Sequence, residues 1–130
     1  MGVFNGLKKA LTSKKPASKD WNRLSKPDEV EAVLKASEAK PQLVYKHSHT
    51  CGTCLFAKGE LEAKFEKLQQ KADLFFVNVK QARPVSDGFA EMLQVCHESP
   101  QVLIIKEGEA IWHASHSAIK ADKALEVLGI

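Results

Sequence analysis

Two cysteines separated by two residues are the part of this sequence best suited to chemistry. Cys51 and Cys54 lie where a strand-like run, residues 41–47, ends and a helix-like run, residues 52–70, begins. A cysteine at the start of a helix faces unpaired backbone N–H groups and the positive end of the helix dipole, and both favour the thiolate over the thiol. The thiolate is the species that attacks disulfides. The pair therefore predicts a thiol–disulfide exchange site.

The positions of the two cysteines predict different roles for them. We expect Cys51 to be the more exposed thiol and to attack a disulfide, forming a mixed disulfide. Cys54, one turn further into the helix and more buried, would then resolve it into an internal bridge, which an external thiol reductant must reopen. His49 is the nearest residue that could lower the pKa of Cys51 as a cation. We expect Lys46 and His47 to be mainly solvated residues at the end of the strand.

Metal binding is a rival interpretation of the same residues. A zinc site could use four ligands, Cys51, Cys54, Cys96 and His97, with His49 as a further possible ligand. Cys96 and His97 are adjacent, however, which is poor geometry for two ligands of one metal. The redox interpretation, which we favour, needs no metal and no cofactor. A non-catalytic interaction domain is the third interpretation, and Cys96 is either a small core residue or a thiol near the active site.

The order of the elements predicts an α/β fold, with helices on both faces of a four-stranded mixed sheet. The first two strands, joined through a helix, should be parallel with a right-handed crossover, and the last two should form an antiparallel hairpin. We expect Ser25 and Ser117 to cap the first and the last helix. The predicted strands are residues 41–47, 73–79, 102–105 and 110–114, and the predicted long helix is residues 52–70.

Length and composition limit the possible domain organisation and location of the protein. At 130 residues, with 44% apolar and 27% charged residues, the chain should form one domain, residues 21–130, preceded by a short arm, residues 1–20. No apolar run approaches the roughly 20 residues of a membrane span. The start of the chain has no pattern of a signal peptide, and three cysteines are too few for a secreted disulfide scaffold. We therefore expect a cytoplasmic protein.

The positive charge of the chain is concentrated in the arm. Residues 1–20 hold five lysines and one aspartate, a net charge of +4. Because the whole chain carries +3, residues 21–130 carry −1. A nucleic-acid-binding face on the domain is therefore not expected. The arm could form a short basic helix that touches a membrane or partner. We favour instead a segment that docks on its own domain or stays mobile, because so short a helix is marginal.

The order of elements, with Cys-x-x-Cys after the first strand and a proline before the third, resembles the thioredoxin superfamily. In that superfamily the proline is cis and stands beside the cysteine pair. The resemblance implies that Pro100 takes this place and that Ser99, just before it, offers backbone groups to an extended substrate. Ser99 and Pro100 are therefore the expected substrate-positioning residues.

Three stretches carry a closer resemblance, to the bacilliredoxin-like YtxJ family: Lys46–Cys51, His97–Gln101 and Ile111–His116. Proteins of this family are small and bacterial, and they are implicated in removing low-molecular-weight thiols, notably bacillithiol, from protein mixed disulfides. The implied partners are thus disulfide-containing proteins, mixed disulfides and a thiol reductant. Such proteins typically carry one active-site cysteine in a Thr-Cys-Pro-x-Ser pattern. This chain has Cys54 where the serine would stand, which makes a dithiol cycle possible.

Overall fold

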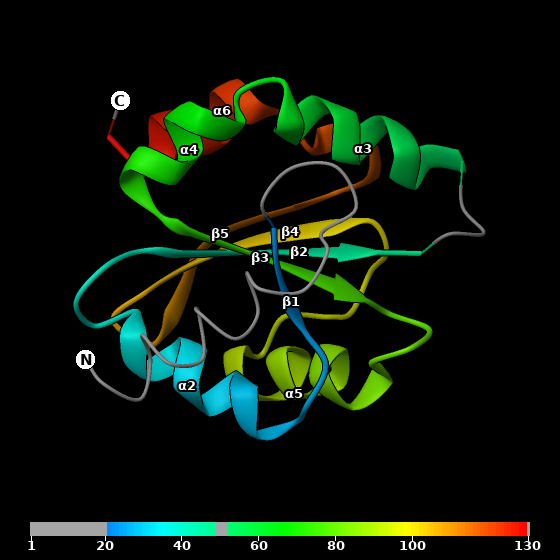
Figure 1. Cartoon of the computed structure of the whole chain (residues 1–130), viewed down its shortest axis with the longest axis vertical. Coiled ribbons are helices and arrows are strands. Elements are labelled where there is room, and N and C mark those ends of the chain that lie inside the picture. Colours follow the sequence, from blue (N-terminus) through cyan, green and yellow to red (C-terminus); the bar gives the residue numbers. More distant parts are fainter. Residues whose placement is uncertain (1–20, 49–51, 130) are drawn as a thin grey trace.

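The computed structural model describes residues 21–48 and 52–129, and within them five strands form one sheet (Figure 1). The strand order is β1-β3-β2-β4-β5. The first three in this order are mutually parallel, β4 is antiparallel to β2, and β5 is antiparallel to β4. The strands are β1 (Asn22–Leu24), β2 (Gln42–His47), β3 (Asp73–Asn78), β4 (Gln101–Lys106) and β5 (Glu109–Ser115).

The predicted α/β fold is confirmed, including the parallel β2–β3 pair and the β4–β5 hairpin. The predicted number of four strands is one too low, because β1 adds an edge strand beside β3. Three residues carry too little alternation of polar and apolar side chains to be recognised as a strand. What holds this segment in place is the preceding residue, Trp21, whose ring packs against Tyr45, Phe65 and Phe76 from three other elements.

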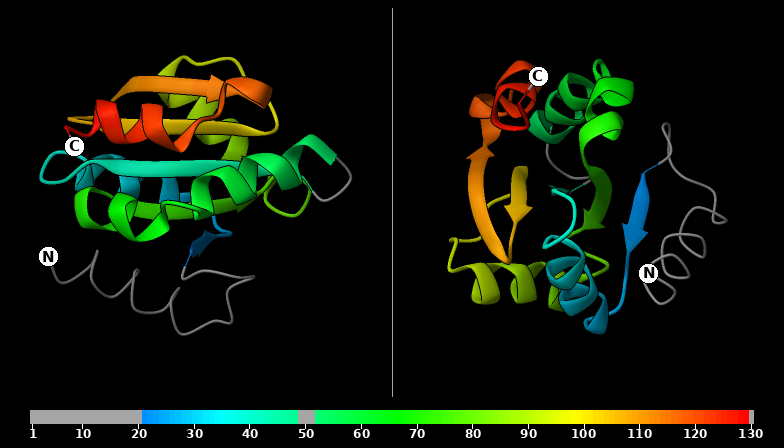
Figure 2. Two further views of the ribbon diagram at one scale, coloured as in Figure 1. Left: turned by 90° about the horizontal axis from the view of Figure 1, so that it is seen from above. Right: turned by 90° about the vertical axis from the view of Figure 1, so that its left-hand side faces the viewer.

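Helices cover both faces of the sheet, as Figures 1 and 2 show. One face carries α3 (Gly52–Glu62), α4 (Phe65–Lys71) and α6 (Ala121–Val127), and the other carries α2 (Asp28–Ala36) and α5 (Arg83–Leu93). A short 3-10 helix, η1 (His116–Ala118), follows β5. Two apolar cores result, one on each face of the sheet. Residues of β2 alternate between them: Leu43 and Tyr45 face α3, while Val44 faces α5.

The helix predicted for residues 52–70 is divided in the structure. α3 ends at Glu62 and α4 begins at Phe65, and Lys64 between them leaves the helical conformation, with φ −122° and ψ 29°. The break changes the direction of the chain so that Phe65 and Leu68 are both buried against the sheet. Tertiary packing therefore overrides a helical periodicity that runs through the break.

Neither predicted serine cap is present. Before α2, the side chain of Glu29 accepts hydrogen bonds from the N–H groups of Ser25 and Lys26, at 2.8 and 2.9 Å. Ser117 lies inside η1, and α6 begins only at Ala121, whose N–H donates to the side chain of Glu60 at 3.2 Å. The N-terminus of α2 is therefore capped by the Glu29 carboxylate in its first turn, and not by the Ser25 side chain as the sequence pattern predicted.

Ser37, at the end of α2, ties that helix to the β4–β5 turn. Its hydroxyl donates to the Leu34 carbonyl and accepts from the Gly108 N–H at 2.8 Å, and its carbonyl accepts from the Glu107 N–H at 2.9 Å. We expect Ser37→Ala to lower the free energy of unfolding by about 1 kcal/mol, because two hydrogen bonds lose their partner. Urea unfolding measures this. The exposed Ser117→Ala is the control and should change stability by less than about 0.5 kcal/mol; equal effects would contradict the assignment.

Candidate active site

Cys54 lies in the first turn of α3 with its side chain fully buried, at 0% exposure. The N–H of Ser48, in the segment that leaves β2, donates to its sulfur at 3.4 Å. The hydroxyl of Ser99, just before β4, lies 3.8 Å from the same sulfur. Cys54 is thus positioned between the carboxyl end of β2 and the segment that enters β4. The predicted burial of this thiol is confirmed.

The Ser99–Pro100 peptide bond is cis, as the thioredoxin resemblance implies. Pro100 is buried, and its carbonyl accepts a hydrogen bond from the N–H of His116 at 3.1 Å. The first residue of η1, directly after β5, therefore holds the segment that carries Ser99 beside Cys54. The structure brings together two of the predicted site residues, Cys54 and Ser99, from positions 45 residues apart in the chain.

Two other predicted residues, Cys51 and His49, lie outside the described residues. The first helical residue described after them is Gly52, which begins α3. Their roles as nucleophile and as pKa-lowering cation remain predictions from the sequence.

Tyr45 and His47 lie on the face of β2 that α3 covers, and neither is exposed to solvent. Their exposures are 0% and 1%, so the expectation that His47 is a solvated strand end is wrong. The hydroxyl of Tyr45 donates to the carbonyl of Cys54 at 2.8 Å and lies 3.0 Å from Nδ1 of His47. Sequence reasoning did not single out Tyr45. The signal for it was available, since residues 45 and 47 alternate onto one face of a strand that ends at the cysteine pair.

Lys46 is also completely buried, on the opposite face of β2, which corrects the same expectation. Its ammonium group donates to the carbonyl of Ser86 at 3.0 Å and lies 3.4 Å from Nδ1 of His97, which is 3.1 Å from the Ser86 hydroxyl. Burial lowers the pKa of Lys46 to about 8, with Asp87 opposing and Arg83 adding to the shift. Burial and the neighbouring Lys46 likewise lower the pKa of His97.

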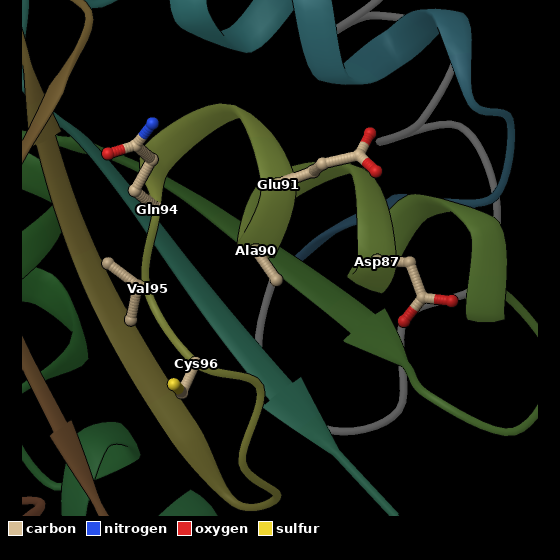
Figure 3. A pocket seen from close by; sticks show the side chains of 6 residues that line it. All are labelled: Asp87, Ala90, Glu91, Gln94, Val95 and Cys96. Carbon is tan, nitrogen blue, oxygen red and sulfur yellow. The ribbon is translucent and has the colours of Figure 1, made fainter.

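Cys96 is exposed, so its interpretation as a core residue is wrong. It lines an open hollow of about 400 Å³ beside α5, shown in Figure 3. Among the described residues, no three or more His, Cys, Asp or Glu side chains gather as a metal site. The described members of the proposed zinc set, Cys54, Cys96 and His97, are therefore not assembled around one point.

Comparisons with known proteins show the family and the fold of the chain. The family model described as monothiol bacilliredoxin BrxC matches residues 22–124. The chain belongs to the bacilliredoxin family. A solved structure described as a candidate oxidoreductase with a thioredoxin fold is 30% identical, with a TM-score of 0.70 over 80% of this chain and 89% of that chain.

Two thioredoxins share the fold of this bacilliredoxin at lower identity. The thioredoxin of Fasciola hepatica is 19% identical, with a TM-score of 0.62 over 82% of this chain and 94% of that chain. A thioredoxin variant from Halobacterium salinarum is 16% identical, with a TM-score of 0.63 over 88% and 93%. Family and fold together support a thiol–disulfide oxidoreductase type of function. Within the described residues, no helix combines the length and apolarity needed to cross a bilayer.

Proposed function

We propose that this bacilliredoxin removes low-molecular-weight thiols from mixed disulfides by a two-cysteine cycle. Cys51 attacks the disulfide and Cys54 resolves the product. The observation that carries the proposal is the place of Cys54: a fully buried thiol in the first turn of α3, 3.8 Å from the hydroxyl that precedes cis-Pro100. A cysteine kept only for packing would need neither this neighbour nor the Ser48 N–H at its sulfur.

The chemistry needs no further component than a thiol reductant. The Cys51 thiolate attacks the sulfur of the small thiol, R–S, in a mixed disulfide, and the target protein leaves as a thiolate. Cys54 then loses its proton and attacks the Cys51 sulfur, so the Cys51–S–R bond breaks and R–S⁻ leaves. The product is an internal Cys51–Cys54 disulfide, which an external thiol reduces again. We expect this cycle to operate in the cytoplasm, where such reductants are maintained.

Ser99 and Pro100 supply the positioning surface in this proposal. The backbone of the residue before the proline would pair with an extended stretch of the target protein, as an added strand does. The Ser99 hydroxyl near the Cys54 sulfur would then lie close to the disulfide that is exchanged.

A one-cysteine cycle is the second candidate, because the matching family is described as monothiol. In that cycle a second molecule of small thiol, and not Cys54, resolves the Cys51 adduct. The complete burial of Cys54 favours this candidate, because a buried sulfur must become accessible before it can attack the adduct.

Comparing cysteine variants of the full chain distinguishes the two cycles. The substrate is hydroxyethyl disulfide, and the products are followed by quenched-flow mass spectrometry after alkylation of free thiols. We expect Cys51→Ser to release no thiol above the rate without protein. Cys54→Ser should release one equivalent of hydroxyethyl thiol and stop as the Cys51 adduct, whereas wild type should release a second and end as the internal disulfide.

Cys96→Ser is the matched control, since it removes an exposed thiol outside the proposed cycle. It should behave as wild type. A Cys54→Ser variant that turns over as fast as wild type, with glutathione, a thiol different from the one released, as the sole reductant, would establish the one-cysteine cycle instead. An active Cys51→Ser variant would remove the basis of both cycles.

A further inference from the structure

The segment between α5 and β4, residues 94–100, carries Ser99 and Pro100, the substrate-positioning residues of the proposed function. Within the described part of the chain, the backbone of residues 96–99 forms no hydrogen bond with another backbone group. The position of such a segment is not fixed by secondary structure. The approach of the Ser99 hydroxyl to the Cys54 sulfur, at 3.8 Å, therefore depends on the side chains that hold the segment.

Lys46, in the central strand β2, contacts this segment through His97. Its ammonium group donates to the carbonyl of Ser86 in α5 at 3.0 Å and lies 3.4 Å from Nδ1 of His97. The same nitrogen of His97 lies 3.1 Å from the Ser86 hydroxyl. An ammonium group can only donate, so in this contact the imidazole nitrogen is the acceptor. Lys46 thus joins a strand, a helix and the segment before cis-Pro100.

Two other hydrogen bonds hold the segment on either side of His97. The side chain of Gln101 donates to the carbonyl of Cys96 at 2.9 Å. The N–H of His116 donates to the carbonyl of Pro100 at 3.1 Å. Between these two points the chain lies free of backbone hydrogen bonds, and the buried contact that His97 makes is the one nearest to Ser99 along the chain.

The charge of Lys46 does not serve an ion pair. The side chain is 0% exposed, and the described residues place no carboxylate at ion-pair distance from it. Asp87 in α5 pairs with Arg83 at 3.0 Å, and Glu98 lies 3.8 Å from His116. A buried cation without a counter-charge is costly, and an apolar side chain of the same length would fill the space. What only the ammonium group provides is a donor to the segment and to α5.

We propose that Lys46 is a positioning residue that, through His97, holds Ser99 and Pro100 where an extended target strand can pair with them. The inference rests on the proposed function and adds a preference to it. Pairing along the backbone binds an extended peptide, whereas a small disulfide offers no strand to pair. Lys46 therefore favours protein mixed disulfides over free small disulfides. It contacts α5 on the far side of the sheet from Cys54, and it neither gives nor takes a proton in the exchange.

The test compares two substrates with the same disulfide. In both, a cysteine is joined to 2-mercaptoethanol; in one it lies within an extended peptide, and in the other it is N-acetylcysteine amide. Release of the cysteine thiol is measured with the full chain and glutathione as the reductant. We expect Lys46→Met to lower kcat/KM for the peptide about 10-fold, through a higher KM, because the pairing surface is displaced. The value for N-acetylcysteine amide should not change.

Three variants separate this role from a general effect on the protein. His97→Leu removes the acceptor and should repeat the effect of Lys46→Met, whereas His97→Asn keeps an acceptor oxygen and should restore most of the activity toward the peptide. Lys106→Met changes an exposed lysine at the opposite end of β4 and should leave both values unchanged. The two His97 variants replace a half-buried side chain, so they test the proposal even if Lys46→Met does not fold.

Amide hydrogen exchange reports on the segment without any substrate. The N–H of His116 is bonded to the Pro100 carbonyl, and the N–H of Val79 is bonded to the carbonyl of His47, at 2.9 Å. We expect Lys46→Met to exchange faster than wild type at His116 and equally at Val79. A general loss of stability would accelerate both sites, whereas loosening of the segment accelerates only the first.

Either of two results would overturn the proposal. One is a Lys46→Met variant with the wild-type kcat/KM for the peptide and the wild-type exchange rate at His116. The other is an equal loss of kcat/KM with both disulfides, which would mean that Lys46 does not act through pairing with an extended strand. Failure of the proposed function itself looks different, since wild type would then release neither thiol above the rate without protein.

Discussion

Replacing Trp21 by alanine is expected to lower the free energy of unfolding by about 3–5 kcal/mol. The side chain is 1% exposed and contacts Tyr45, Phe65 and Phe76, so its removal leaves a cavity between β1, the central strands and α4. Because domains are stable by only about 5–15 kcal/mol, this single change removes a large part of the total. Urea unfolding followed by circular dichroism measures it.

Two variants separate the packing of Trp21 from its hydrogen bond. The indole N–H donates to the carboxylate of Glu62 at 2.7 Å. Trp21→Phe keeps most of the ring contacts and should cost less than half as much as Trp21→Ala. Glu62→Gln keeps an acceptor for the indole and should cost about 1 kcal/mol. If Trp21→Ala were within about 0.5 kcal/mol of wild type, the tryptophan would not anchor β1.

Lys46→Met is expected to stabilise the protein at neutral pH, by about 2 kcal/mol. The buried ammonium group is costly, which is why its pKa falls from 10.5 to about 8. Between these two values the unfolded chain binds more protons than the folded one, so rising pH stabilises wild type through this group. Methionine has a similar volume and no charge. Its advantage should therefore be largest below about pH 8 and should disappear toward pH 10.5.

The measurement is urea unfolding of wild type and variant at a series of pH values, compared as a difference so that other titrating groups cancel. The control is Lys106→Met, an exposed lysine of β4, which should stay within about 0.5 kcal/mol of wild type throughout. A Lys46→Met variant that is less stable than wild type at pH 7 would contradict the prediction. The hydrogen bond to the Ser86 carbonyl would then outweigh the cost of burying the charge.

The burial of Cys54 and the strand pair beside it could be predicted because each depends on local pattern. Cys54 is buried in the first turn of a helix that starts where the periodicity changes, and β2 and β3 pair in parallel through that helix. The environment of Lys46 and His47 could not be predicted this way. Polar residues at a strand end are usually solvated, but these two lie in a sheet that helices cover on both faces, and both are buried.

By itself the sequence determined the order of the elements, the α/β class and the position of the cysteine pair, because these follow from side-chain periodicity and spacing along the chain. The tertiary structure alone decided the fifth strand, the break before α4, the meeting of Cys54 with Ser99 and the Tyr45–His47 hydrogen bond. These depend on contacts between residues distant in the chain or on burial by other elements. Such contacts form only where the gain from packing exceeds the local preferences that a sequence displays.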